Sequence, residues 1–217
     1  MSDHFKQVLG TSIDTSGEPC QLRDIFLDSK SWKLKFVRTK DAIIPAFAIG
    51  IREKKLKCFL STPQLLSLVT WSSDVGVNRA FEETYLNKLG LKTVESEDSD
   101  LPPINYTSMI QANDSGGISP DTYQSMAALM DFEIETSTGP LGKIVDSVID
   151  FSTQNLRYFV AEDFKQKERF VLIDPEWIEE LDTKKKRVIV SLSREILLLE
   201  ALLDSKREGA NRYEIDV

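Results

Sequence analysis

Apolar and polar residues alternate along several short stretches of the chain, which is typical of β-strands with one buried face. The alternation is plain at Trp32, Leu34 and Phe36, which are separated by lysines. β-branched and apolar residues next to turn residues predict further strands over 22–27, 56–60, 141–149, 156–160 and 188–192. Gly139 and Gly142 are expected to mark a turn before the strand over 141–149. The pattern therefore predicts a mainly β protein.

Helical spacing predicts short helices beside these strands. Phe81, Tyr85 and Leu89 fall on one stripe of a helix over 78–89, which Gly90 ends. Shorter helices are expected over 5–9, after Ser61 with Pro63 in the first turn, and over 123–130. A closing helix over 194–205 begins after Ser193 as its N-cap and is rich in leucine.

The central part of this pattern occurs twice. Seven residues lie 122 positions before a counterpart of similar kind: Gly17, Leu22, Asp24, Asp28, Leu34, Lys35 and Phe36 match Gly139, Ile144, Asp146, Asp150, Leu156, Arg157 and Tyr158. Matches from 57–66 to 169–178 lie 112 positions apart, which predicts about ten extra residues in the first copy near 41–52. At the position of Gly142 in the second copy, the first copy has Cys20, preceded by Pro19. The first copy also lacks a clear equivalent of the strand over 188–192.

The repeat predicts two small domains rather than one large domain. We assign 1–91 to the first domain with its following helix, and 123–217 to the second domain with its leucine-rich helix. The segment 92–122 between them begins with acidic residues, contains Pro-Pro and Gly-Gly pairs and has no sustained periodicity. These features indicate a linker.

The stretches over 24–37 and 169–178, and the order of the elements around them, resemble the PRC-barrel family. The chain is similar to bacterial proteins with two such barrels in tandem, and to the cytoplasmic domain of the photosynthetic reaction centre H subunit. The resemblance implies two small β-barrels with short flanking helices. One barrel of about 70 residues buries only a thin core and leaves edge strands open, so we expect the two copies to pack as a pseudo-two-fold pair. The resemblance also implies a role in assembling complexes, and it carries over no cofactor ligand.

Composition narrows the classes of partner. The net charge of −8 and the pI near 4.9 argue against direct binding of nucleic acid, which needs a positive surface. Cys20 and Cys58 are too few for a disulfide framework, which favours a reducing compartment. There is no signal-peptide pattern, and no apolar run reaches the roughly 20 residues that a membrane-spanning helix needs. We expect a soluble, cytoplasmic protein without a membrane span.

A metal site or an acid–base mechanism would have to use carboxylates or cysteines alone, because His4 is the only histidine. The aspartates form two pairs with equal spacing, Asp24 with Asp28 and Asp146 with Asp150. Their recurrence at matching positions favours a structural role, in which they accept backbone N–H bonds in turns. The alternative is a small-ligand or cation site, or an enzyme active site, in a cleft between the two barrels.

The leading hypothesis is a non-enzymatic protein-binding or adaptor module without a cofactor. Its partner-binding residues are predicted to be Trp71, which lies among polar neighbours, and Leu198, Leu199 and Leu202 in the closing helix. A third hypothesis is a homodimer whose seam is the same leucine-rich helix.

Overall fold

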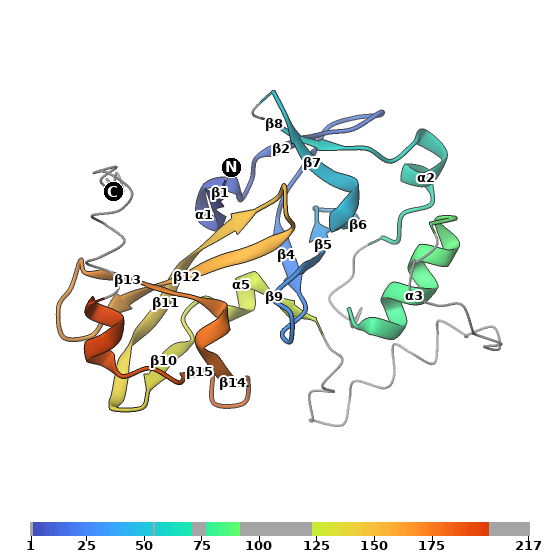
Figure 1. Ribbon diagram of the computed structural model, residues 1–217. Coiled ribbons are helices and arrows are strands. Elements are labelled where there is room, and N and C mark those ends of the chain that lie inside the picture. Colours follow the sequence, from blue (N-terminus) through green and yellow to red (C-terminus); the bar gives the residue numbers. More distant parts are fainter. Residues whose placement is uncertain (1, 54, 71–76, 92–122, 200–217) are drawn as a thin grey trace. The chain divides into compact units, whose positions relative to one another are not determined.

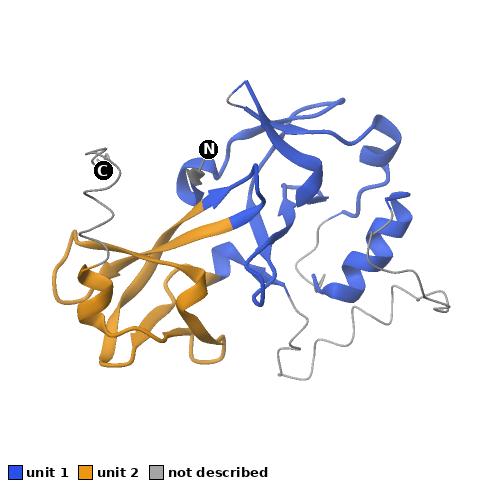
Figure 2. Ribbon diagram, in the orientation of Figure 1, with its two compact units in different colours: residues 1–128, 149–155 blue, residues 129–148, 156–217 orange. Residues whose placement is uncertain are grey.

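The computed structural model describes residues 2–53, 55–70, 77–91 and 123–199 of the chain, which is mainly β as predicted (Figure 1). The chain divides into two compact units (Figure 2): the first contains residues 1–128 and 149–155, and the second contains residues 129–148 and 156–217. Residues 123–128 thus belong to the first unit, together with the turn of the long hairpin whose two arms belong to the second.

The first unit holds two four-stranded sheets. One has the order β3-β2-β8-β7, from β2 Ser12–Asp14, β3 Cys20–Gln21, β7 Ile49–Arg52 and β8 Lys55–Cys58. The other has the order β6-β5-β4-β9, from β4 Asp24–Leu27, β5 Leu34–Arg38, β6 Ile43–Pro45 and β9 Gln124–Ser125. Neighbouring strands are antiparallel except β2 and β8, which are parallel.

The β4–β5 hairpin confirms the strand–turn–strand pattern predicted from the alternation. Leu34 and Phe36 are buried, and Lys35 between them is only half-buried. In the turn, the carboxylate of Asp28 accepts a backbone N–H bond of 2.9 Å, as expected for a turn aspartate. Trp32 was predicted to lie in the strand, but its φ of +54° places it in the turn. The second strand therefore begins at Leu34.

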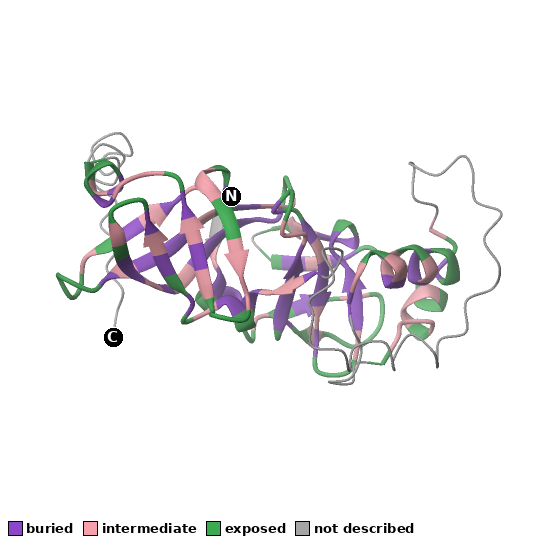
Figure 3. Ribbon diagram, turned by 90° about the horizontal axis from the view of Figure 1, so that it is seen from below, coloured by how far each residue is buried: buried purple, intermediate pink, exposed green. Residues whose placement is uncertain are grey.

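The second unit is built on one sheet with the order β13-β12-β11-β10-β15-β14. Its strands are β10 Glu133–Thr136, β11 Gly139–Asp150, β12 Asn155–Asp163, β13 Phe170–Ile173, β14 Ile178–Asp182 and β15 Arg187–Val190. β10 and β15 are parallel, whereas β12–β13 and β14–β15 are antiparallel. More and less buried positions alternate along β13 and β15. Figure 3 shows the same alternation of buried and less buried positions along strands of the protein. β13 and β14 lie at the ends of this order, so the described residues form open sheets and no closed barrel.

The prediction of a turn at Gly142 is wrong, because this residue lies inside β11. A Cβ atom at Gly142 would lie 1.8 Å from the backbone oxygen of Glu162 in β12. Only glycine permits this approach of the two strands. The first unit has Cys20 at the corresponding position, and there the strand is interrupted between β3 and β4. We infer that the cysteine side chain prevents the same close approach.

The expectation that the first copy lacks an equivalent of the strand over 188–192 is also wrong. β8 runs parallel to β2, with Ile13 opposite Leu56, and β15 runs parallel to β10, with Ile134 opposite Val188. β8 therefore holds the same place in the pairing order as β15. The predicted match of 57–66 to 169–178 is wrong for the same reason, and so is the ten-residue insertion near 41–52, because β13 Phe170–Ile173 corresponds to β6 and not to β8. The lysines of β8, at alternate positions of a four-residue strand, hid its equivalence to β15 in the sequence.

The described helices are short: α1 Phe5–Val8, α2 Thr62–Leu66, α3 Arg79–Lys88, α5 Met126–Leu129, the 3-10 helices η1 Ala46–Ala48 and η3 Pro175–Trp177, and residues 194–199; strand β1 is Ser2–His4. α3 confirms the predicted helix. The side-chain oxygen of Asn78 caps it by accepting the N–H of Phe81 at 2.8 Å, and Gly90 follows it with a φ of +69°. Among the described residues, no helix has the length and apolar character to cross a membrane.

Candidate functional site

The predicted carboxylate pair of the first copy has structural contacts at both positions. Asp24 is buried, and its oxygens accept the N–H of Ala127 at 3.0 Å and the hydroxyl of Ser125 at 2.6 Å. Arg38 lies at 3.9 Å from the same carboxylate. Asp24 thus joins the start of β4 to the start of α5, while Asp28 closes the turn after β4.

The pair of the second copy behaves in the same way. Asp146 accepts the N–H of the next residue at 2.8 Å. Asp150 accepts the N–H groups of Ser152 at 2.9 Å and Thr153 at 3.3 Å, inside the turn of the long hairpin. Burial raises the pKa of Asp150, but the bond from the Ser152 hydroxyl and these two N–H bonds outweigh burial and hold the pKa below its ordinary value. These contacts agree with the structural interpretation of the four aspartates.

The described residues include two thiols and no cluster of metal-ligating side chains. No group of three or more His, Cys, Asp and Glu side chains among these residues could hold a metal ion. Cys58 is buried, Cys20 is half-buried, and neither forms a disulfide. Burial raises the pKa of both thiols, so they are poor nucleophiles at neutral pH.

A better candidate site is the helix over 194–199 of the second unit, which a buried ion pair attaches to the sheet. One guanidinium nitrogen of Arg194 lies 2.7 and 2.6 Å from the two carboxylate oxygens of Asp163, at the end of β12. The other terminal nitrogen donates to the carbonyl of Leu141 in β11 at 3.2 Å. The side chain of Asp163 has an exposed fraction of 0%. The first residue of the helix is therefore fixed to two strands.

The electrostatics of this anchor favour the charged pair. Burial raises the pKa of Asp163, but bonds from Arg194 and from the N–H of Lys165 outweigh burial and hold the pKa below its ordinary value. The predicted N-cap is also present: the N–H of Ile196 lies 3.4 Å from the hydroxyl of Ser193, and the N–H of Arg194 donates to the hydroxyl of Thr138 at 3.1 Å.

The anchored helix leaves apolar side chains in solvent. Leu197 is fully buried, whereas Ile196 is 47% exposed and Leu199 is 57% exposed. Of the four predicted partner-binding residues, the structure thus exposes Leu199 and half-buries Leu198. Trp71 and Leu202 lie outside the described residues. Ile196 was not predicted, although its position three residues before Leu199 is the helical spacing that could have identified it.

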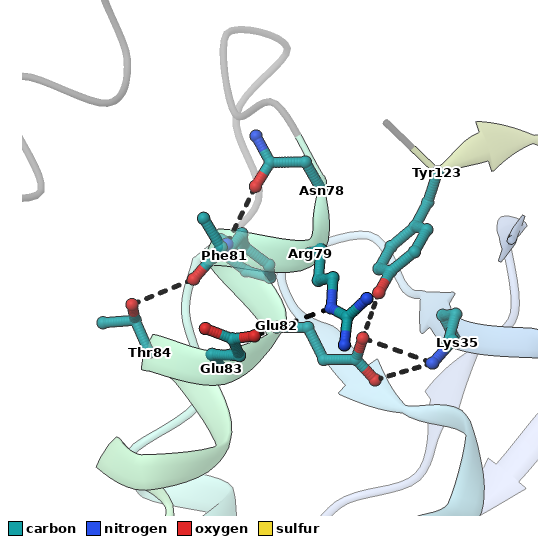
Figure 4. Close-up of polar contacts among 9 residues, drawn as sticks. Lys35, Asn78, Arg79, Phe81, Glu82, Glu83, Thr84 and Tyr123 are labelled. Atoms are coloured by element: carbon teal, nitrogen blue, oxygen red, sulfur yellow. Dashed lines mark hydrogen bonds and ion pairs between the residues drawn. The ribbon is translucent and has the colours of Figure 1, made fainter. Parts of the chain in front are cut away.

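A polar cluster in the first unit was missed entirely by the sequence analysis (Figure 4). Lys35 of β5 lies 3.2 and 3.3 Å from the two carboxylate oxygens of Glu82 in α3, and the hydroxyl of Tyr123 donates to the same carboxylate. The ammonium of Lys35 also lies 5.5 Å from the centre of the Tyr123 ring. Burial, and then the bond to Glu82, raise the pKa of Tyr123 above its ordinary value. The cluster therefore attaches α3 to the sheet and contains a phenol that stays neutral.

Beneath this cluster, α3 packs its predicted apolar stripe against the sheet. The core there consists of Phe26, Phe36, Ile43, Val77, Phe81, Tyr85, Leu89 and Tyr123. The rings of Phe36 and Phe81 meet edge to face with centres 5.6 Å apart. The burial of this stripe explains why Asn78 to Leu89 has helical spacing in the sequence.

Comparison with known proteins supplies no assignment. No protein-family model matches the chain, and no significant match to a curated protein exists.

Proposed function

We propose that this protein is a non-enzymatic protein-binding or assembly module of the PRC-barrel type, and that the helix over 194–199 is its docking element. The observation that carries the proposal is the exposure of Ile196 and Leu199 on a helix fixed by the buried pair of Arg194 and Asp163. Leaving either charge buried without its partner would be costly, so the pair holds the start of this helix in one place on the sheet. Large apolar side chains held rigidly in solvent are typical anchors of protein interfaces.

The two-copy part of the proposal is supported by the pairing orders of the two units, whereas its PRC-barrel type rests on the resemblance of the sequence. In both units a parallel pair (β2–β8, β10–β15) lies beside an antiparallel partner (β7, β14). Trp32 and Gln154, which are 122 positions apart, occupy the two hairpin turns with φ of +54° and +55°. Leu22 donates its N–H to Thr11, and Ile144, 122 positions after Leu22, donates its N–H to Phe132. Two copies of one β unit explain these coincidences, while closure into barrels and a pseudo-two-fold pair remain predictions.

The test compares charge insertion at the docking helix with the same change elsewhere. The wild-type chain and its Leu199→Glu variant would be used as bait in lysate, with light scattering of both to detect a homodimer. Leu66→Glu is the matched control, because Leu66 is an 84% exposed leucine on α2 of the first unit. We expect a stoichiometric partner, or a dimer mass, that Leu199→Glu loses and Leu66→Glu retains. Equal retention by both variants would rule out the helix as the docking element.

A further inference from the structure

The outer edge of β6 in the first unit is covered by the chain itself. The N–H of Ile43 donates to the carbonyl of Val69 at 3.3 Å, and Ala42 forms an antiparallel bridge with Thr70. The carbonyl of Ile43 accepts the hydroxyl of Tyr85 at 2.5 Å, and that hydroxyl accepts the N–H of Val69 at 3.2 Å. Both polar groups that Ile43 presents at the edge are therefore satisfied, as edge strands require.

β13 is the strand of the second unit that corresponds to β6. In the first unit Ile44 lies opposite Val37, and in the second Ile173 lies opposite Phe159, the residue 122 positions after Val37. Each strand ends in a 3-10 helix, η1 or η3. By this correspondence, Leu172 takes the place of Ile43.

The hydrogen-bond pattern shows which groups of β13 face outward. The N–H of Asp163 donates to the carbonyl of Arg169 at 3.0 Å, which makes these two a hydrogen-bonded pair of the antiparallel ladder. Hydrogen-bonded pairs recur at every second residue, so Val171 and Ile173 also bond to β12. The N–H and carbonyl of Leu172 consequently point away from β12. Within the described ranges, these two groups have no hydrogen-bond partner, and β13 ends the strand order.

Charged and aromatic groups surround this open edge. The loop before β13 carries Lys165, Lys167 and Arg169 against one acid, Glu168, whereas Asp174 and Glu176 follow the strand. Phe164 and Phe170 are 51% and 37% exposed beside it. In the first unit the covering residues run antiparallel to β6. A segment that covers β13 in the same direction would have its C-terminal end beside the basic loop, so acidic residues at that end complement the charge.

We propose that the outer edge of β13 binds an extended, apolar segment of a partner protein, which adds as an antiparallel strand opposite Leu172 and carries acidic residues at its C-terminal side. This is strand addition to an exposed sheet edge, with main-chain bonds supplying affinity and flanking side chains supplying specificity. In the first unit, residues 69–70 of the chain itself take this place: the N–H of Ile43 donates directly to the carbonyl of Val69, and the hydroxyl of Tyr85 links the other two main-chain groups. The inference uses a different element from the docking helix over 194–199 and does not depend on it.

The probe is a fluorescein-labelled peptide with the sequence of residues 67–70 followed by three glutamates, titrated with the full-length protein and followed by anisotropy. Its valine N–H would bond the carbonyl of Leu172, so a peptide N-methylated at that valine is the first control and leaves the protein unchanged. We expect the N-methyl group to weaken binding at least tenfold. Leu172→Pro should have a similar effect, because proline removes an outward N–H and is tolerated in edge strands.

Charge variants complete the test. Lys167→Glu should weaken binding several-fold, whereas Lys184→Glu, an exposed lysine in the turn between β14 and β15, should leave it unchanged. Equal affinity for the methylated and unmethylated peptides would overturn the proposal. A dimer in light scattering that Leu172→Pro converts to a monomer would overturn it too, because a second copy would then occupy the edge.

Discussion

The hydroxyl oxygen of Tyr85 in α3 lies 2.5 Å from the carbonyl oxygen of Ile43 in β6. The same hydroxyl accepts the N–H of Val69, so one side chain is inserted between an edge strand and the segment that covers it. Tyr85 has an exposed fraction of 0%, and burial raises the pKa of its phenol above the ordinary value. Helix α3 thus provides more than apolar contacts, because its Tyr85 hydroxyl satisfies main-chain hydrogen-bonding groups at the edge of β6.

Replacement of Tyr85 by phenylalanine should destabilise the protein by about 1–3 kcal/mol, since it leaves the buried carbonyl of Ile43 and the part-buried N–H of Val69 without this partner. The ring and its packing are kept, so the loss reports the hydroxyl alone. Urea unfolding measures the stability, and amide hydrogen exchange at Val69 should accelerate more than exchange at Val171 in the other unit. An unchanged unfolding midpoint with unchanged exchange at Val69 would contradict the role of the hydroxyl.

The phenol of Tyr123 should titrate above the ordinary range for tyrosine, because burial and the carboxylate of Glu82 both disfavour the phenolate. A raised folded-state pKa stabilises the folded protein below the unfolded pKa of about 10, and this stabilisation is lost as the pH rises through the folded value. Glu82→Gln should lower the pKa of Tyr123 in an ultraviolet titration. Glu83→Gln is the matched control: its pair with Arg79 is exposed, and the charge of Arg79 has only a small effect on the pKa of Tyr123, so the titration should shift far less. Identical titrations of both variants would refute the coupling.

Gly142→Ala should destabilise the second unit by about 1–3 kcal/mol or prevent its folding, because the added methyl group meets backbone that cannot easily move. Gly17→Ala is the control: the nearest atom to its Cβ would be a threonine hydroxyl at 3.7 Å, an ordinary contact. Thermal unfolding of both variants tests the difference. If Gly142→Ala and Gly17→Ala had equal melting temperatures, the close approach of β11 and β12 at Gly142 would not be needed for stability.

The spacing of apolar and polar residues predicted the elements whose structure depends on residues close in sequence. The β4–β5 hairpin and helix α3 follow from the spacing of apolar residues and from capping residues such as Asn78 and Gly90. Gly142 was read as a turn because a glycine in sequence does not reveal whether it serves a turn or the close approach of another strand. The place of β8 was missed for a similar reason, since a four-residue strand has too few positions to show its partner.

The candidate sites were predictable only in part. The leucine spacing of the closing helix led to Leu198 and Leu199, but exposure of Ile196 depends on how Arg194 fixes the helix. That contact joins residues 31 positions apart, and the bonds of Glu82 to Lys35 and Tyr123 span 47 and 41 positions. No local pattern encodes contacts of that range. The recurrence of the aspartates, in contrast, correctly indicated hydrogen bonding to backbone N–H groups.

Asp163 should make the free energy of unfolding of the wild type fall at low pH. The sign of this dependence should reverse when Arg194 is removed. The folded-state pKa of Asp163 is lowered, so its stabilising contribution is present above the unfolded pKa of about 3.9 and is lost as the pH falls through the folded value. Asp163→Asn leaves a buried guanidinium without its carboxylate and should cost about 3–5 kcal/mol at pH 7. Asp182→Asn, at the end of β14, is the control and should cost far less, because the lysine that pairs with Asp182, Lys185, is 67% exposed.

Arg194→Met should reverse the pH dependence that Asp163 contributes. Without the guanidinium, burial dominates and raises the pKa of Asp163 above its unfolded value. Its contribution is then largest below the unfolded pKa and is lost as the pH rises, so stability relative to the wild type should fall between about pH 4 and pH 7. Urea unfolding in steps of pH measures both slopes. Parallel curves for the wild type and Arg194→Met would mean that Arg194 does not set the charge state of Asp163, and the docking helix would then lack its electrostatic anchor.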